Sequence, residues 1–279
     1  MFKVIANTQL SPNVWRLDVM APRIAQIRQA GQFVIVCKGE NCERVPLTIA
    51  DASPKEGWIS LVIQAIGKST RQLVALQAGE FIRDISGPLG KPTELAAPGQ
   101  KAVCVGGGVG TGVVHPIAQG LHAKGVKVVS VIGGRSKPWV FFEQELKRYG
   151  EVVVCTDDGS YGRKGFVTDA VREQLEAGGV DTVYAVGPVP MMRAMAQLTK
   201  PFGVHTVVSL NPIMVDGTGM CGGCRVTVGN EVKFACVDGP EFDGHQVDFD
   251  NLWDRLGSYK TQEKEALDLF LQECQCAKQ

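Results

Sequence analysis

No apolar run in this sequence approaches the roughly 20 residues needed to cross a bilayer, and its first residues lack the apolar core of a signal peptide. Net charge is also missing, since 29 basic residues balance 29 acidic ones. The overall charge therefore gives no reason to expect nucleic acid or an anionic membrane as a partner. Internal repeats and low-complexity tracts are absent as well. We expect a cytoplasmic protein with neither a membrane nor a nucleic-acid partner.

Histidine is scarce, with four residues in the chain, and none stands at a spacing typical of a metal site. Disulfides are not expected, because nine cysteines is an odd number and a reducing cytosol keeps thiols reduced. The cysteines are therefore interpreted as thiols or metal ligands.

The 279 residues that are present, 44% of them hydrophobic, suffice for two domains, since single cores stop growing near about 250 residues. Residues 1–97 contain short runs between turns in which apolar and polar residues alternate, for example 14–19 and 58–63. Alternation is typical of β-strands, and the spacing predicts an antiparallel β-barrel. One short helix is expected from Ser69 to Leu76.

From residue 98 to 212 short buried strands alternate with helical patterns, which predicts a Rossmann-like parallel α/β domain. Residues 213–250 are rich in glycine and cysteine. Residues 251–279 predict a charged helix over 251–273 and a tail. The expected fold class is thus β plus α/β, with a small C-terminal loop region.

The cysteine-rich segment carries the strongest chemical signal. Cys221 and Cys224 form a Cys-x2-Cys pair, Cys236 follows twelve positions later, and Asp216 stands where plant-type 2Fe-2S loops have a first cysteine. Four metal ligands are thus available, and the glycines between them let backbone amides turn toward a negatively charged cluster. A structural zinc site is the alternative, since Zn²⁺ accepts three thiolates and a carboxylate.

Two glycine-containing turns each follow a predicted strand and open a predicted helix. Gly107, Gly108, Val109, Gly110 and Thr111 form the first, although the strict GxGxxG spacing is not met. Such a turn offers backbone amides and a helix dipole to a pyrophosphate. Gly187, Pro188 and Met191 belong to the second, and two turns at the carboxyl ends of parallel strands define one crevice. Packing alone is the alternative for either turn.

Further candidates lie beside these turns and in the barrel. Asp157 and Asp158 could accept hydrogen bonds from ribose hydroxyls, and Arg135 could face a 2'-phosphate; a solvated turn and a surface charge are the alternatives. The candidate flavin contacts in the barrel form two groups, one with a cation and a hydroxyl and one at a helix N-terminus. They are Arg44, Pro46, Leu47 and Thr48, and Gly67, Lys68, Ser69 and Thr70.

The order of these parts resembles the ferredoxin-NADP reductase superfamily, in the branch of the electron-transfer subunits of dihydroorotate dehydrogenase. Within that branch the chain is similar to the small subunits of NADH-dependent reduced ferredoxin:NADP+ oxidoreductases. Four stretches carry this closer likeness: Glu43 to Asp51, Thr156 to Val167, Gly187 to Met192, and Ser209 to Cys221. The resemblance covers nearly the whole chain.

The resemblance implies FAD in the barrel, NAD(H) in the α/β domain, and a 2Fe-2S cluster held by Asp216, Cys221, Cys224 and Cys236. It implies hydride exchange between NAD(H) and FAD and single electrons passing through the cluster. In that reaction we expect Thr48 to act as the catalytic residue that hydrogen-bonds flavin N5 or its neighbourhood. The implied partner is a large glutamate-synthase-like subunit with flavin and 4Fe-4S clusters, which would reach ferredoxin within an electron-bifurcating complex.

Three positions depart from the wider superfamily pattern. The flavin motif would place its arginine at Val45, so Arg44 is offset by one residue, and the cysteine that often precedes Gly-Pro is Val186 here. Asp216 replaces the first cluster cysteine of the dihydroorotate branch, which favours the ferredoxin:NADP+ branch.

Two other hypotheses stay open at this point. The chain could be the electron-transfer subunit of dihydroorotate dehydrogenase or of a sulfide or sulfite enzyme. It could also be a non-catalytic, zinc-bearing scaffold that has kept the fold.

Overall fold

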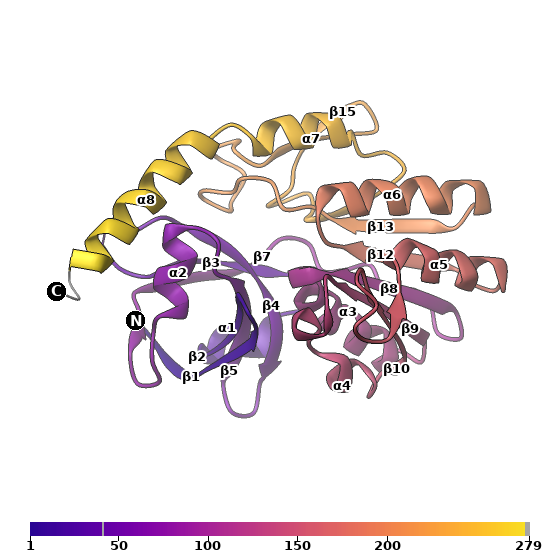
Figure 1. The fold of residues 1–279 in the computed structure, drawn as a ribbon, viewed down its shortest axis with the longest axis horizontal. Helices are drawn as coiled ribbons and strands as arrows, with labels where there is room; N and C mark the ends of the chain where they lie inside the picture. The colour runs from indigo at the N-terminus through magenta and orange to yellow at the C-terminus, as the bar shows by residue number, and fades with distance from the viewer. Residues whose placement is uncertain (41, 277–279) are drawn as a thin grey trace.

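The computed structural model describes residues 1–40 and 42–276. It contains two seven-stranded sheets and one two-stranded sheet. Figure 1 shows the first sheet as a barrel at the N-terminal end, the second sheet layered with helices beside it, and the C-terminal quarter lying across both. Residues 213–250 are called the cluster segment below.

The N-terminal sheet is antiparallel, with strand order β6-β1-β2-β5-β4-β3-β7, and it curls into a nearly closed barrel. Aliphatic side chains from alternate strand positions, among them Leu17, Ile49 and Leu61, fill its interior. This confirms the predicted barrel. Its elements are β1 Phe2–Ser11, β2 Val14–Met20, α1 Pro22–Ile27, β3 Phe33–Cys37, β4 Val45–Ser53, β5 Trp58–Gln64, α2 Lys68–Val74, β6 Phe81–Ile82 and β7 Asp84–Leu89.

The second sheet has the order β11-β10-β9-β8-β12-β13-β16, and every pairing except that of β16 is parallel. Alternate residues of β8 face opposite layers: Val103 and Val105 pack toward α5 and α6, whereas Ala102 and Cys104 pack toward α3. The predicted α/β domain is confirmed. Its elements are β8 Lys101–Gly107, η1 Gly108–Gly110, α3 Thr111–Ala123, β9 Lys127–Gly134, η2 Lys137–Trp139, α4 Glu143–Leu146, β10 Gly150–Thr156, β11 Arg163–Lys164, α5 Val167–Glu176, β12 Thr182–Val186, α6 Val189–Thr199, η3 Lys200–Phe202 and β13 His205–Ser209.

The cluster segment contains a hairpin of β14 (Arg225–Val228) and β15 (Glu231–Phe234), followed by β16 (Glu241–Asp243). β16 pairs antiparallel with β13 and so becomes the edge strand of the α/β sheet. The cluster segment is therefore bonded into the second domain through its backbone.

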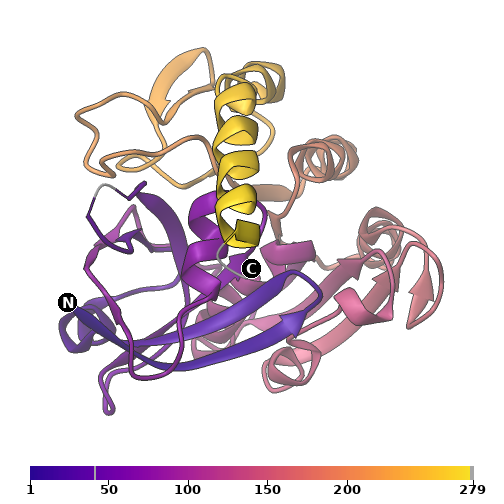
Figure 2. The ribbon, with the colours of Figure 1, turned by 60° about the vertical axis from the view of Figure 1, so that its left-hand side comes forward.

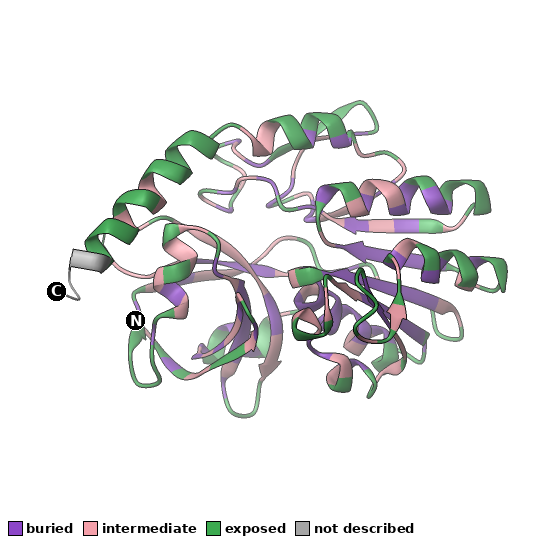
Figure 3. Ribbon diagram, viewed as in Figure 1, coloured by how far each residue is buried: buried purple, intermediate pink, exposed green. Residues whose placement is uncertain are grey.

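The C-terminus forms two helices, α7 (Phe249–Leu256) and α8 (Lys260–Cys276). The single helix predicted over residues 251–273 is wrong in this respect, because Gly257 interrupts it; glycine favours helix ends over helix interiors. α8 packs against α2 of the barrel, as Figure 2 shows from the side, and most of its surface is exposed (Figure 3). Among the described residues, no helix is both long and apolar enough to cross a membrane.

A buried seam joins the barrel to the α/β domain. His115 on α3 lies with its Nδ1 atom 2.9 Å from the carbonyl oxygen of Ala50 on β4. Tyr184 on β12 donates its hydroxyl to the Glu94 carbonyl, at 2.8 Å, in the connection between the domains. These contacts fix one domain against the other.

Glu241 on β16 is half-buried as a residue, and its carboxyl group is buried where the barrel, the α/β sheet and the cluster segment meet. Its Oε1 atom accepts a hydrogen bond from Thr93 Oγ1 at 2.9 Å, and its Oε2 atom has no partner among the described atoms. Burial raises the pKa of this carboxyl from 4.5 to about 7, partly offset by the Thr93 hydrogen bond. Cys104 and Tyr184 are the ionisable groups beside it.

We expect this carboxyl to make the folded state less stable as the pH rises. Because the folded pKa lies above the unfolded value, its stabilising contribution is complete below pH 4.5 and is lost as the pH approaches about 7. Glu241→Gln should therefore be more stable than wild type at pH 8 by roughly 3 kcal/mol, at about 1.4 kcal/mol per pKa unit. Urea unfolding at pH 4.5 and pH 8 measures this difference. Glu94→Gln, which changes an exposed carboxyl nearby, should follow wild type; parallel curves for Glu241→Gln and wild type would contradict the assignment.

Candidate functional site

A cleft of about 680 Å³ opens between the barrel and the α/β domain. Its volume lies within the range of about 300–1000 Å³ that is usual for small-molecule sites. The cleft is walled by β3 to β5 on one side and by the turns after β8, β9 and β12 on the other. Residues 209–214, which lead into the cluster segment, close one end.

The barrel wall of the cleft contains Pro46, Leu47 and Thr48 from β4 and Thr70 from α2. Pro46 and Leu47 supply apolar surface, and the two threonines supply hydroxyls. The amide of Gly67 donates to Thr70 Oγ1 at 3.1 Å, which closes the first turn of α2. This wall can therefore receive a planar aromatic group and hydrogen-bond its polar edge.

The opposite wall consists of the two predicted glycine turns, which lie side by side because β8 and β12 are adjacent strands. A β-carbon at Gly110 would overlap the Val186 carbonyl oxygen and lie 2.6 Å from the carbonyl carbon. Gly108 has a φ of +56°, a conformation that favours glycine. Tight turns of this kind bring backbone amides close to a bound phosphate. Their lining residues are Gly107, Gly108, Val109, Gly110, Gly187, Pro188 and Met191.

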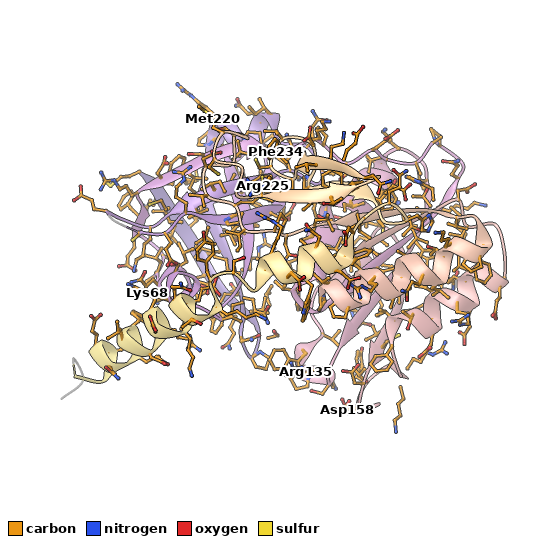
Figure 4. All side chains as sticks on the ribbon, turned by 90° about the horizontal axis from the view of Figure 1, so that it is seen from above. Lys68, Arg135, Asp158, Met220, Arg225 and Phe234 are labelled. Atoms are coloured by element: carbon orange, nitrogen blue, oxygen red, sulfur yellow. The ribbon has the colours of Figure 1, made fainter. Side chains whose placement is uncertain are left out.

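Arg135 and Asp157 also line the cleft, at the carboxyl ends of β9 and β10. The guanidinium carbon of Arg135 lies 5.8 Å from the centre of the Trp139 ring, which limits where this cation can move. Figure 4 shows Arg135 and Asp158 at the same edge of the molecule. Asp158 does not line the cleft; its carboxylate accepts a hydrogen bond from the Ser160 amide at 2.9 Å, and hydrogen bonds from Ser160 lower its pKa.

Five other predicted contacts also lie outside the cleft lining. Thr111 is buried beneath Gly106 at the start of α3. Gly67, Lys68 and Ser69 lie at the start of α2, where the Ser69 hydroxyl donates to the Glu43 carboxylate. Arg44 points to the cluster segment, because its Nε atom donates to the Val215 carbonyl at 2.8 Å.

The loop from Asp216 to Cys224 folds around the Asp216 carboxylate. That carboxylate accepts hydrogen bonds from the amides of Thr218 and Cys221, the latter at 2.6 Å. These bonds, with Thr218 the larger contributor, lower the pKa of Asp216 to about 2. Asp216 is thus ionised at neutral pH, as a metal ligand must be.

Cys224 and Cys236 face each other in the core, with their sulfur atoms 3.2 Å apart. Two thiolates on one tetrahedral metal with bonds of about 2.3 Å lie about 3.8 Å apart, so a small adjustment would suffice. Burial, together with the neighbouring Cys224 thiol, raises the pKa of Cys236 to about 12. A cation is therefore needed to hold the Cys236 sulfur as a thiolate at neutral pH.

The four predicted ligands form two pairs. Asp216 and Cys221 share the exposed side of the loop, and Cys224 and Cys236 share its buried side. Within the part of the chain that the structure describes, no three His, Cys, Asp or Glu side chains gather around one point. Two pairs fit a 2Fe-2S cluster, in which each iron takes two protein ligands. The donor set and its arrangement therefore fit this cluster.

The cleft lining and the hydrophobic core that contains the buried thiols share residues. Phe33 and Met214 line the cleft, and both also pack in the hydrophobic core that contains Cys224 and Cys236. Sequence reasoning did not identify these two residues as part of the site, because Phe33 reads as one apolar position in a strand. Its place in the site depends on its packing in a core that also includes Met214, about 180 residues away.

Other lining residues were also not singled out as contacts, and most are backbone or apolar positions without a local signature. The exceptions belong to stretches that carry the family resemblance: Val45, Ala50, Gly165, Phe166, Val167, Ser209, Leu210, Asn211 and Met214. The full set is Asn13, Phe33, Val45, Ala50, Val62, Gln64, Ile66, Gly112, Val113, Gly133, Gly134, Trp139, Gly165, Phe166, Val167, Val186, Ser209, Leu210, Asn211, Met214 and Pro240.

Two family models match the chain. Residues 104–197 match the oxidoreductase NAD-binding domain. Residues 211–248 match the iron-sulfur cluster binding domain of dihydroorotate dehydrogenase B. The first match contains both glycine turns, and the second contains all four predicted cluster ligands.

Whole-chain relatives agree with these matches. A Thermotoga maritima homologue of the dihydroorotate dehydrogenase B (NAD+) electron-transfer subunit is 43% identical, over 96% of this chain and 95% of its own. The Bacillus caldolyticus electron-transfer subunit is 36% identical, over 88% of this chain and 96% of its own. A chain in the solved structure of NADH-dependent reduced ferredoxin-NADP oxidoreductase, reported for flavin-based electron bifurcation, is 40% identical with a TM-score of 0.93. That alignment covers 97% of this chain and 98% of the other.

Proposed function

The chain belongs to the family of dihydroorotate dehydrogenase B electron-transfer subunits and their homologues, and on that premise we propose that it is the small subunit of an NADH-dependent reduced ferredoxin:NADP+ oxidoreductase. The predicted set of FAD, NAD(H) and a 2Fe-2S cluster is confirmed by the two domain matches and the flavin-reductase fold. The chain would exchange hydride between NAD(H) and FAD and pass single electrons to a larger subunit.

The continuity of the cleft lining with the cluster segment is the observation that supports this proposal. Met214 lines the cleft and stands two residues before the proposed ligand Asp216. When bound, FAD supplies hydride chemistry with nicotinamide, and the cluster supplies one-electron transfer.

The residues of the chain have separate tasks in this scheme. We propose that the glycine turns bind the dinucleotide and that Thr48 hydrogen-bonds the reacting edge of the flavin. Pro46 and Leu47 would pack on its ring, and Thr70 would hydrogen-bond it. We propose FAD binding for residues 1–97, nucleotide binding for 98–212, cluster binding for 213–250, and partner contacts for the cluster segment and residues 251–279.

The family relatives are electron-transfer subunits, which implies a larger partner subunit. Around the cluster loop, Met220 is 89% exposed, Val215 51% and Val237 38%. Met220 projects at the edge opposite Arg135 and Asp158 (Figure 4). We propose that this apolar rim contacts a large glutamate-synthase-like subunit carrying flavin and 4Fe-4S clusters, and that ferredoxin is reached through that subunit in the cytoplasm.

Two observations favour this branch over dihydroorotate dehydrogenase. Asp216 provides a carboxylate that is ionised at neutral pH, at the position where the dihydroorotate branch has a cysteine. In addition, the Bacillus caldolyticus subunit matches 96% of its own length but only 88% of this chain, so this chain has a segment that the relative lacks. The iron-sulfur model ends at residue 248, and we infer that the additional segment is α7 with α8.

Spectroscopy and turnover of the purified chain test the proposal. We expect flavin and iron-sulfur absorbance, reduction of the flavin band by NADH without oxygen, and faster dye reduction with NADH than with NADPH. Copurification of the large subunit, followed by assays with ferredoxin, dihydroorotate and polysulfide, separates the related enzymes. A clear preference for NADPH would contradict the assignment of this chain as the small subunit of an NADH-dependent reduced ferredoxin:NADP+ oxidoreductase. Colourless protein with stoichiometric zinc would support a scaffold instead.

A further inference from the structure

Arg44 links the barrel to the cluster loop across 171 residues of sequence. Its Nε atom donates to the Val215 carbonyl at 2.8 Å, and an Nη atom lies 3.4 Å from the Asp216 carbonyl. Its other Nη atom is 4.0 Å from the Asp84 carboxylate on β7. The side chain is thus directed toward the backbone of a predicted cluster ligand and does not line the cleft.

The packing beneath this contact holds the same loop against the barrel. Gly217, which follows the ligand Asp216, has a φ of +80° and leaves no room for a side chain. A β-carbon there would lie 2.7 Å from Leu89 and 2.9 Å from Ile35, both on barrel strands. Arg44 therefore closes the edge of an interface whose interior is apolar.

We propose that Arg44 is a positioning residue that holds the cluster loop on the barrel and places a positive charge beside the Asp216 end of the cluster. This inference rests on the proposed cluster site. Charge-assisted hydrogen bonds to carbonyls restrict the loop, and a nearby cation favours the more negative, reduced cluster. The sequence made Arg44 a candidate flavin contact, whereas the contacts above point to the cluster loop.

Arg44→Gln, which removes the cation, tests this proposal in the full chain. In cluster-free protein, iodoacetamide should alkylate Cys224 and Cys236 about tenfold faster in the variant, the scale set by losing a charge-assisted hydrogen bond. In cluster-loaded protein, the reduction potential of the cluster should shift to a more negative value. FAD content per chain should equal that of wild type.

Two further variants make the test specific. Arg44→Lys keeps the charge, so its potential should stay near wild type while its alkylation rate rises. Arg83→Gln removes a surface arginine that pairs with Glu40 at 2.6 Å and should match wild type in every measurement.

Loss of FAD from Arg44→Gln with unchanged alkylation would identify a flavin ligand and overturn the proposal. Wild-type behaviour in all three measurements would also overturn it. If wild type itself binds no iron, the proposed function fails first, and the alkylation rates of cluster-free protein still decide whether Arg44 holds the loop.

Discussion

Cys224→Ala is expected to lose essentially all cluster iron while keeping its flavin. The thiol is 1% exposed and faces Cys236, so no neighbouring group can replace it as a ligand without rearranging the core. Changes around a metal site beyond the ligands themselves cost about 10–100-fold in affinity or activity, and removing a ligand should exceed that range. Iron analysis and the electron paramagnetic resonance signal of the reduced cluster measure the loss.

The same variant should separate the two halves of the electron path. NADH should still reduce the flavin band, because the cleft lining does not include Cys224. Electron delivery to the partner subunit should fall by more than about 100-fold. Full delivery without iron would contradict a path through the cluster.

Cys155→Ala is the matched control for this experiment. Cys155 is also 1% exposed and lies in the same hydrophobic core as Cys224, but on β10, away from the cluster loop. Removing its sulfur should cost a similar, small amount of stability, on the order of 1 kcal/mol. Its iron content should match wild type, and equal iron loss in both variants would indicate a general packing defect.

Gly110→Ala is expected to weaken nucleotide binding at least about tenfold at the opposite end of the path. Its methyl group would overlap the carbonyl of Val186, and since both partners are backbone, no side-chain rotation can relieve the clash. The two glycine turns would have to separate, and both line the cleft. Overpacking of this kind costs about 1–3 kcal/mol or more.

Thermal unfolding and nucleotide titration check this result. We expect Tm to fall by roughly 5–10 °C and the Kd for NADH to rise at least about tenfold, because misplaced backbone amides no longer reach the phosphates. Chemically reduced protein should still show the cluster signal. Wild-type Tm and Kd would mean that the turns have room for a side chain.

Gly203→Asn provides the control for backbone effects. Gly203 has a φ of +64° at the end of η3, and apart from its two chain neighbours no described residue has an atom within 4 Å of the position of a β-carbon. Asparagine tolerates this conformation, so the cost should stay below about 1 kcal/mol. Nucleotide affinity should be unchanged.

Local patterns by themselves determined the chemical parts of this protein. A cluster loop needs closely spaced ligands and glycines. The stretch from Asp216 to Cys224 can therefore be recognised as a cluster loop from its own nine residues. A phosphate-binding turn likewise needs glycine between a strand and a helix. This local pattern predicted a phosphate-binding turn from Gly107 to Thr111. The spacing of hydrophobic residues differs between strands and helices, so it predicts local structure directly. The alternation of the two spacings from residue 98 to 212 therefore predicted the α/β domain.

Only the tertiary structure decided how these parts meet. The contact of Arg44 with Val215, the packing of Phe33 and Met214 in one core, and the hydrogen bond from Thr93 to Glu241 each join segments far apart in the chain. The apolar residues involved look like any core position, and an arginine at a strand end looks like a surface charge. Which partner each side chain finds depends on how the barrel, sheet and cluster segment pack together, and that packing is a property of long-range contacts.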